Sequence, residues 1–466
     1  MASLGVILMG SGPVAAQPAA AGGMILPAPS QNPQSIDFAT DPLIAFVRAE
    51  TPSERFRAAV AEAVIRHPAV GEAEAGTTEA RARRREVRAG LFPRFDGQVV
   101  VARSIARDFG ANTAIVEGLQ PRSRADATVG GEQLLFDFGA TGGRIAGASA
   151  TVRAARAESQ RIAANTAQRA VAAWYTVLLY RMLGDVSDAS VARLRSITGD
   201  TRTRQQSGLG AGGDTARAEA GLADAVGRTA RIERALAEGV AEYREIFGDA
   251  PPPLLRRPAP PVSQATTVEN ARALSHVTPA ALTALARAEA AAAEARAARA
   301  DRLPRLSAGV NGSYYDVFDR AKDYDVRGQV VLRQGLSTGG AEAARAAQAG
   351  ARARAAQYAS DRVIAEAERD AAAAFADSQI LDRSLVSLED AYRANRRARD
   401  VTVEQFRVSR GSLLDVLRVE QEFVASASAY LQGAVERDLA RYVLLARTGE
   451  ILPLFDVKMT DGEPSR

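Results

Sequence analysis

The residues with the clearest chemical character stand beside two glycine-containing turns. Asp214 follows the glycine-rich run 207–213, and Asp415 lies three residues after Ser412. A serine at this spacing before a carboxylate is typical of a helix-capping pair, and an aspartate near a helix start can accept hydrogen bonds from the unpaired backbone amides there. The two acids therefore indicate helix starts, and a binding role for them needs support from the rest of the chain.

Other residues do not form a catalytic or metal-binding pattern. The chain has no cysteine, which excludes disulfides, thiolate metal sites, cysteine nucleophiles and lipid attachment at an N-terminal cysteine. His67 and His276 lack neighbours at ligand spacing and are expected at helix starts on the surface. The sequence contains no phosphate-binding loop. We therefore expect no enzyme, no metal site and no cofactor.

The composition favours long, thin helical packing. Alanine supplies much of the 47% hydrophobic content, while aromatic residues make up only 5%. Small side chains let helix backbones approach closely. The net charge of +4 is small for 466 residues, and the arginines alternate with acids and alanines along helices. This pattern predicts solvated helix faces rather than a nucleic-acid-binding surface.

The chain repeats the same order of sequence features twice. Pro93, in a Leu-Phe-Pro-Arg run, returns as Pro304, 211 residues later, and Asp214 returns as Asp415, 201 residues later. A period near 200 residues is far longer than the roughly 20–50 residues of solenoid repeats. It indicates an internal duplication within one structural unit. Between these points the offset falls to 197, so the first copy has the longer hairpin loop.

The repeat and the composition divide the chain into six segments. The apolar run at 4–9, followed by small residues, indicates a secretory signal, and no run of 18 apolar residues predicts a transmembrane helix. The six segments are a signal peptide (1–16), a Pro/Ala-rich linker (17–52), a first repeat (53–250), a Pro-rich linker (251–268), a second repeat (269–452) and a polar tail (453–466). Each repeat is expected to hold a helix, a β-hairpin (94–136 and 305–335) and a long helical hairpin (144–248 and 341–448).

The strand pattern is clearest in the second copy. Residues 306–314 and 324–333 alternate apolar or small side chains with polar ones. Period-two alternation over about ten residues predicts strands with one apolar face. Such a strand is long enough to cross a bilayer when tilted, although a soluble two-faced sheet gives the same pattern. In the first copy, strands are expected at 95–102 and 125–136.

Two hairpins supply only four strands per chain, too few to close a wide barrel. Open sheet edges inside lipid leave backbone groups without hydrogen-bond partners. If these strands cross a membrane, several chains must therefore share one barrel.

The helices that follow are far longer than those of ordinary globular proteins. The first copy predicts one helix from 53 to 91 and another from 144 to 206, and the second copy predicts one from 341 to 408, about 100 Å long. Apolar residues in the last of these advance in steps of three and four, which is a coiled-coil seam. The seam residues are Ile364, Ala367, Ala371, Ala374, Ser378, Leu381, Leu385, Leu388, Tyr392 and Asn395.

Over about residues 53–452, this arrangement resembles the TolC family of outer-membrane export channels. The motifs that carry the resemblance are the Pro-Arg runs at 91–94 and 302–305, Leu-Phe-Asp-Phe-Gly at 135–139, the turn at 208–214, and Ser-Leu-Leu-Asp-Val-Leu at 412–417. The second copy departs from the family at 332–336, where Leu-Arg-Gln-Gly-Leu replaces a proline-aromatic-Asp pattern.

The resemblance implies an α+β membrane protein with internal two-fold duplication. Long coiled-coil helical hairpins would form an α-barrel across the periplasm, and four β-strands per chain would contribute to a shared twelve-stranded trimeric β-barrel in outer-membrane lipid. The passive tunnel of this homotrimer would carry secreted protein or small molecules. Its partners would be a periplasmic adaptor (membrane fusion) protein and an inner-membrane ABC or RND-type transporter. The missing lipidated cysteine favours the branch that serves type I secretion.

The resemblance also implies roles for residues at the helical tips. Asp415 matches an acidic position that narrows the entrance in this family, whereas Arg418 stands where a second acid is usual. Asp214 and Arg410 would form a contact between tips. Three-fold symmetry would place three Asp415 carboxylates in one ring, while the Ser412 spacing predicts a helix cap for the same residue. The turn residues expected to dock the adaptor are Gly208, Leu209, Val408 and Ser409.

A soluble periplasmic coiled-coil adaptor or scaffold is the alternative function. Such a protein would share the helical hairpins, but it would not need two pairs of strands with an apolar face.

Overall fold

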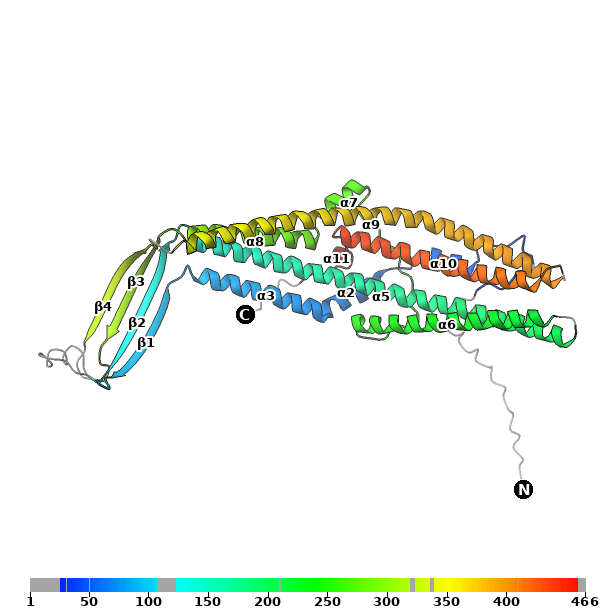
Figure 1. Ribbon diagram of the computed structural model, residues 1–466, viewed down its shortest axis with the longest axis horizontal. Coiled ribbons are helices and arrows are strands. Elements are labelled where there is room, and N and C mark those ends of the chain that lie inside the picture. Colours follow the sequence, from blue (N-terminus) through cyan, green and yellow to red (C-terminus); the bar gives the residue numbers. More distant parts are fainter. Residues whose placement is uncertain are drawn as a thin grey trace, which may run out of the picture. The chain divides into compact units, whose positions relative to one another are not determined.

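In a computed structural model, the chain is described at residues 26–30, 32–49, 51–106, 123–208, 211–318, 323–335, 339–408 and 410–459. The expected signal peptide (1–16) lies outside the described residues. The elements in chain order are α1 (Pro42–Arg48), α2 (Glu54–Arg66), α3 (Pro68–Ala89), β1 (Arg94–Arg103), β2 (Ser123–Phe136), α5 (Ala140–Gln206), α6 (Gly212–Phe247), α7 (Val268–Ser275), α8 (Pro279–Ala300), β3 (Arg305–Tyr314), β4 (Tyr324–Arg333), α9 (Ala341–Arg407), α10 (Leu413–Arg447) and α11 (Ile451–Leu454) (Figure 1).

The structure confirms the predicted long helical hairpins and the four strands. The two longest helices, α5 and α9, each contain 67 residues. Every residue of the predicted seam in α9 is buried or half-buried, including Ala371 and Tyr392, which are fully buried. None of the described helices is long and apolar enough to cross a membrane.

The predicted single helix at 53–91 is wrong, because the structure divides it into α2 and α3. Pro68 occupies the first turn of α3, and His67 caps that turn through Nδ1, which accepts from the Ala69 amide at 3.2 Å. Proline cannot continue the preceding helix because it lacks an amide hydrogen. In the second copy the corresponding break separates α7 from α8, and His276 ends α7 rather than starting a helix.

The described chain forms two compact units, and each unit takes segments from both sequence copies. Unit 1 contains residues 1–56, 171–261 and 379–440, and unit 2 contains the remainder. The long helices α5 and α9 therefore contribute to both units. The predicted division into two sequence repeats remains a prediction about origin and is compatible with this interleaving.

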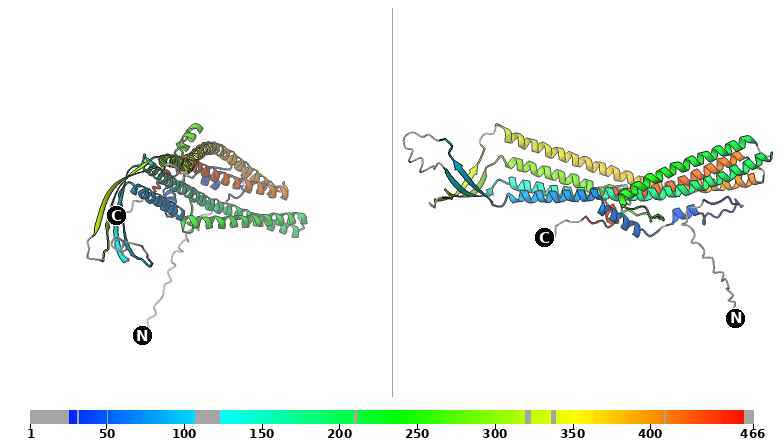
Figure 2. Two further views of the ribbon diagram at one scale, coloured as in Figure 1. Left: turned by 60° about the vertical axis from the view of Figure 1, so that its left-hand side comes forward. Right: turned by 90° about the horizontal axis from the view of Figure 1, so that it is seen from below.

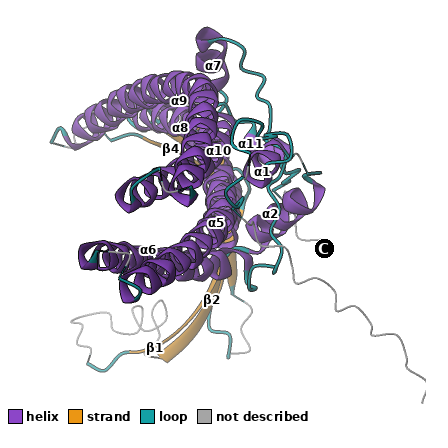
Figure 3. Ribbon diagram, turned by 90° about the vertical axis from the view of Figure 1, so that its right-hand side faces the viewer, coloured by secondary structure: helices purple, strands orange, loops and turns teal. Residues whose placement is uncertain are grey.

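In unit 1, the helices follow the order α6, α5, α10 and α9 (Figure 3). A hydrophobic cluster holds the first three together, with residues from α5, α6 and α10. Close packing between α9 and α10 depends on Gly433, since a Cβ there would lie 2.4 Å from Leu388 Cδ1. The α10 seam residues Phe423 and Tyr430 stack on Tyr392 of α9, with ring centroids 5.7 and 5.9 Å away.

In unit 2, α3, α8 and the first parts of α5 and α9 lie side by side next to the sheet (Figure 2). Alanines fill the contact between α8 and α5, as the composition predicted. Gly143 approaches so closely that an added Cβ would lie 3.0 Å from the Ala297 backbone. Arg144 of α5 donates to both carboxylate oxygens of Asp301 at 2.6 Å, which joins the start of α5 to the end of α8.

The sheet is an antiparallel meander in the order β1-β2-β3-β4. Each hairpin has its two strands in register, and β2 pairs with β3 between the hairpins, with a bulge between Leu134 and Phe136. The two copies therefore join through one continuous sheet, a pairing that the sequence did not predict.

Candidate functional site: the sheet and the helical tips

The pairing register places most of the large exposed apolar residues of the four strands on one face. Val99 pairs with Ala127, which pairs with Tyr314, which in turn pairs with Tyr324. Side chains of directly paired residues lie on the same face of a sheet. The strongly exposed hydrophobic residues that share this face are Phe95, Val99, Val101, Val129, Phe136, Val310, Tyr324, Val326, Val330 and Leu332.

The opposite face carries most of the charged and amide side chains. One cross-strand row runs from Asp96 through Gly130 and Asn311 to Arg327, and another from Gln98 through Thr128 and Ser313 to Asp325. A sheet with one exposed apolar face and one polar face has the pattern of strands in a membrane barrel, where the apolar side meets lipid and the polar side meets water.

A tight turn at Asp137 links the sheet to α5. Its carboxylate accepts from the Thr141 amide at 2.6 Å and from the Gly139 amide at 3.1 Å, and Phe138 and Gly139 have positive φ. Burial raises the pKa of Asp137, but these hydrogen bonds outweigh that effect and hold its pKa below the usual value. This turn explains the Leu-Phe-Asp-Phe-Gly motif. At the end of the second hairpin, Gln334 instead donates to the Arg302 carbonyl at 3.2 Å.

Beyond the sheet, the candidate site residues gather at the tips of the two helical hairpins. Beneath the tips lies a buried apolar cluster of Val191, Leu194, Ile197, Ala218, Ala225, Leu413, Val416 and Leu417. The two hairpins also meet through Arg204 of α5, whose guanidinium lies over the ring of Phe406 in α9, 4.9 Å from its centroid. This cation–π contact was not anticipated from the sequence, because the two residues are 202 positions apart.

Asp415 lies in the first turn of α10 and is exposed. Its amide donates to Ser412 Oγ at 3.2 Å, and the Ser412 hydroxyl donates to Asp415 Oδ2 at 2.7 Å. The capping spacing is therefore realised in the structure. Arg418 pairs with Glu422 at 3.7 Å instead of with Asp415, and both of those side chains are exposed.

Asp214 does not cap α6, although the sequence suggested it. The N-cap position is Ala211, which provides no side-chain hydrogen bond, and Asp214 stands in the first turn. An acid there interacts favourably with the positive end of the helix dipole. Asp214 pairs with Arg217 at 3.3 Å, and within the described residues Arg410 forms no ion pair. The expected Asp214–Arg410 contact is thus not formed within one described chain.

Of the four expected docking residues, Gly208 and Val408 are described, and both are exposed. Gly208 has φ of +73°, which its lack of a Cβ allows and which ends α5. Leu209 and Ser409 lie outside the described residues.

Sequence reasoning missed a set of buried charges around the N-terminal segment. Asp41 caps α1 through the amides of Leu43 and Ile44, and the same carboxylate binds Arg396 and the hydroxyl of Tyr392 in α9. Its signal in the sequence was the Asp-Pro pair that starts α1, which reads as a helix cap. The partner arginine lies in an alternating-charge helix, where nothing distinguished it from solvated arginines.

Comparisons with known proteins agree with this geometry. No family model matches the chain. The outer membrane efflux protein BepC of Brucella suis is 27% identical over 367 residues, which cover 76% of this chain and 80% of that protein. Structural likeness extends to proteins of lower identity. A membrane protein of Pseudomonas aeruginosa has a TM-score of 0.77 at 19% identity, covering 87% of this chain and 98% of its own.

Two further solved structures share the fold. The outer membrane protein VceC of Vibrio cholerae has a TM-score of 0.75 at 18% identity, over 85% of this chain and 96% of its own. The open MtrE outer membrane channel of Neisseria gonorrhoeae has a TM-score of 0.73 at 17% identity. The match covers 85% of this chain and 89% of the MtrE chain. The similarity to BepC and the fold shared with these solved structures agree with the resemblance to the TolC family of outer-membrane channels.

Proposed function

We propose that three copies of this chain form one passive export tunnel through the outer membrane and across the periplasm. The observation that carries the proposal is the four-stranded sheet with an exposed apolar face and two unpaired edges, β1 and β4. Within lipid, the backbone groups at these edges have no water to bond. Pairing β4 of one copy with β1 of the next satisfies them, and three copies of four strands close a twelve-stranded barrel.

The helical hairpins continue the tunnel on the periplasmic side. The tips, with Gly208, Leu209, Val408 and Ser409, are the proposed contact with a periplasmic adaptor protein. That adaptor connects the tunnel to an inner-membrane ABC or RND-type transporter, which supplies the energy. Secreted proteins and small molecules are the two candidate cargo classes. The name of BepC describes an efflux protein, and this supports small molecules as cargo.

The proposed entrance gate is a ring of three Asp415 carboxylates. Asp415 is exposed at the start of α10, and in the described chain its bond from Ser412 uses one of its two carboxylate oxygens. Repeated around a three-fold axis, one carboxylate per chain gives a negative ring that selects and binds cations. Arg418 lies one turn further along α10, where a second acid would add a second negative ring. Its ion pair with Glu422 reduces its repulsion of cations. Asp214 and Arg410 stand at the neighbouring tips as further entrance residues.

The soluble adaptor or scaffold is the less favoured function. Ten large hydrophobic side chains on one exposed sheet face would make such a protein aggregate in water. Recovery of the protein in the soluble periplasmic fraction, rather than in carbonate-washed outer membrane, would contradict the tunnel.

Cysteine cross-linking tests the shared barrel, because the natural chain contains no cysteine. Single cysteines would replace polar-face residues in β1 and β4 together, for example Gln98→Cys with Gln329→Cys. Three strand spacings separate β1 from β4 in one chain, roughly 14 Å, which no disulfide can span. We expect oxidation of a set of such pairs to yield dimers and trimers in denaturing gels. Monomers for every register tested would contradict the shared barrel.

Planar-bilayer recording tests the gate. Asp415→Asn should weaken block by a trivalent cation by about tenfold, since it removes the charge of the ring. Ser412→Ala is the matched control, because it removes the cap but keeps the carboxylate, and block should stay near its original strength. Unchanged block in Asp415→Asn would leave Asp415 as a helix cap only.

A further inference from the structure

The outer surface of the α9–α10 hairpin is covered by a segment of the same chain. Helix α1 is bonded to it at both ends: Asp41 at its start pairs with Arg396, and Arg48 at its end pairs with Glu389 at 2.7 Å. The hydroxyl of Tyr430 in α10 donates to the same Glu389 carboxylate at 2.9 Å. We call this surface the α1 seat.

The α5–α6 hairpin has the corresponding surface, because the two copies align at an offset of 201 in these helices. At that offset Glu389 matches Asp188, Arg396 matches Arg195, and Tyr430 matches Thr229. Acid and arginine therefore stand seven residues apart in the same order on both long helices. Seven residues of helix span about 10 Å, which is also the length of the seven-residue α1.

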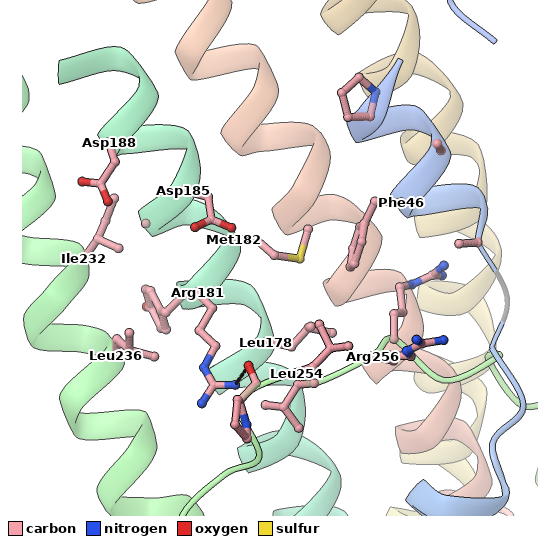
Figure 4. A pocket seen from close by; sticks show the side chains of 18 of the residues that line it. Phe46, Leu178, Arg181, Met182, Asp185, Asp188, Ile232, Leu236, Leu254 and Arg256 are labelled. Carbon is pink, nitrogen blue, oxygen red and sulfur yellow. Dashed lines mark hydrogen bonds between the residues drawn. The ribbon is translucent and has the colours of Figure 1, made fainter. Parts of the chain in front are cut away.

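In the first copy, the segment 251–257 lies along part of this surface, and the described chain leaves the rest of it open. A groove of about 1070 Å³ lies between α6, α5 and the outward side of α1, and Asp188 and Thr229 line it (Figure 4). Its apolar walls include Phe46, Leu178 and Met182, with Ile232 and Leu236 from α6. Further along the same faces of α5 and α6, Arg195 lines a second hollow of about 370 Å³.

Two charged residues of these surfaces, Asp188 and Arg195, lack the ion pairs that their counterparts have in the described chain. Asp188 and Arg195 are exposed and form no ion pair within the described residues, whereas Glu389 and Arg396 each hold one end of α1. Asp185 and Glu233 also line the groove. The groove cation Arg181 is engaged by the carbonyls of residues 251–253. The end of the groove at Asp188 is therefore acidic and suited to a basic group.

We propose that this α5–α6 groove binds a short amphipathic helical segment of another protein that resembles α1 in chemistry. The segment carries an acid at its N-terminal end for Arg195, three apolar residues for the groove wall, and an arginine or lysine at its C-terminal end for Asp188. Binding of this kind lays the apolar face of a helix into a groove and uses charges to set its direction. A second copy of this chain is not the occupant, because its own α1 is already buried in its seat, with Leu43, Ile44 and Val47 covered.

The test uses the purified full-length protein and a synthetic peptide with the sequence of residues 40–49, in which a benzophenone amino acid replaces Ile44. We expect photo-cross-links to α5 and α6, with Met182 as the main acceptor, and saturable binding of the fluorescent peptide. Asp188→Lys should weaken binding about five- to tenfold, because an attraction at one end becomes a repulsion. A peptide with Arg48→Glu should regain binding to Asp188→Lys and bind the natural protein poorly.

Asp224→Lys is the matched control, since Asp224 is an exposed acid of α6 outside the groove lining, and it should leave binding within about twofold. Cross-links confined to α9 and α10 would show that the peptide displaces α1 from its own seat, and this would overturn the proposal. Absence of saturable binding would overturn it as well, and so would equal affinity of both peptides for the natural protein. The comparison of the two peptides on the natural protein keeps the test valid even if Asp188→Lys folds poorly.

Discussion

The α5–α6 and α9–α10 hairpins follow one plan in the sequence but are stabilised by different forces. In α9–α10, Asp400 and Asp438 are fully buried and each binds an arginine. At the matching positions, α5–α6 carries Gly199 and Ala237. The second hairpin therefore depends on buried charge pairs, which are costly to break because an unpaired charge is left inside.

The first hairpin depends on aromatic packing instead. Trp174 of α5 lies edge-on to Phe56, with ring centroids 5.1 Å apart, and Tyr243 stacks on Phe247 at 4.2 Å in α6. These contacts carry no charge, and Phe56 brings α2 against the first hairpin. On the second hairpin, the polar groups of the N-terminal segment complete the buried network, as Asp41 does with Arg396 and Tyr392.

Breaking the most buried ion pair should give the largest effect. Arg257 donates to both oxygens of Asp438, at 2.6 and 2.8 Å, and its side chain is 2% exposed. Asp438→Ala leaves this guanidinium buried without a carboxylate and should lower the free energy of unfolding by about 3–5 kcal/mol. Urea unfolding of the detergent-solubilised protein measures the change. The exposed Asp224→Ala in α6 should change stability by less than about 0.5 kcal/mol, and equal losses would remove the contrast between the hairpins.

Loosening the N-terminal segment should have a smaller effect. Asp41→Ala removes the cap of α1 and the partner of Arg396 and Tyr392, at a cost of about 2–3 kcal/mol. Limited proteolysis should then cleave within residues 26–49 before it cleaves elsewhere. The neighbouring Asp37→Ala serves as control, since Asp37 is exposed and accepts from the Ala39 amide at 2.9 Å. Protease resistance equal to that of the natural protein would show that α1 does not depend on this carboxylate.

Removing the helix cap at one tip and adding a cap at the other should change stability in opposite directions, each by about 1 kcal/mol. Ser412→Ala removes the hydroxyl that caps α10 and should destabilise that tip by about 1 kcal/mol. Ala211→Ser supplies a cap that α6 lacks, at a position whose φ of −81° and ψ of 141° suit an N-cap, and should stabilise that tip by about 0.5–1 kcal/mol. Hydrogen exchange of the first-turn amides reports each tip separately. Changes of the same sign in both variants would contradict the difference in capping.

Acid should weaken the second hairpin through Glu389. Burial raises the pKa of Glu389, but hydrogen bonds from Tyr430 and Arg393 and the charge of Arg48 outweigh it, so that its pKa lies below the usual value. The ionised carboxylate therefore contributes its full stability at pH values above the ordinary glutamate pKa. That contribution is lost as the pH falls through the lower pKa that Glu389 has in the folded protein. The stability gap between the natural protein and Glu389→Gln should shrink from about pH 7 to about pH 3.

Asp188→Asn in the first hairpin is the matched control for that titration. Its carboxylate forms no ion pair in the described part of the chain, so the substitution should leave stability nearly unchanged. A Glu389→Gln gap that stays constant, or that grows as the pH falls, would contradict the assigned role of Glu389.

The sequence predicted elements well where the pattern is local and repeated. Ten residues of period-two alternation gave β3 and β4, and steps of three and four gave the buried seam of α9. It failed where one residue redirects the chain, as at Pro68, which divides the first predicted helix. It also failed for long-range partners: Asp41 and Arg396 are 355 residues apart, and neither residue type nor spacing connects them.

For the candidate site, the sequence predicted the cap at Asp415, because Ser412 lies within one helical turn of it. It did not predict that Asp214 would bond to Arg217, since several arginines lie within reach of each tip. Positions of the tips relative to one another depend on three-dimensional packing such as the Arg204–Phe406 contact. The gate and docking roles of the tip residues stay predictions of the family resemblance.

Planar-bilayer recording of the purified, natural protein tests the central claim most directly. In its described part, one chain has four strands and two open sheet edges, too few strands to enclose a pore alone. If three chains close a barrel, the protein extracted from the outer membrane should produce discrete conductance steps that favour cations. Protein that is purified in folded form but leaves the bilayer electrically silent would contradict the shared barrel and, with it, the proposed tunnel.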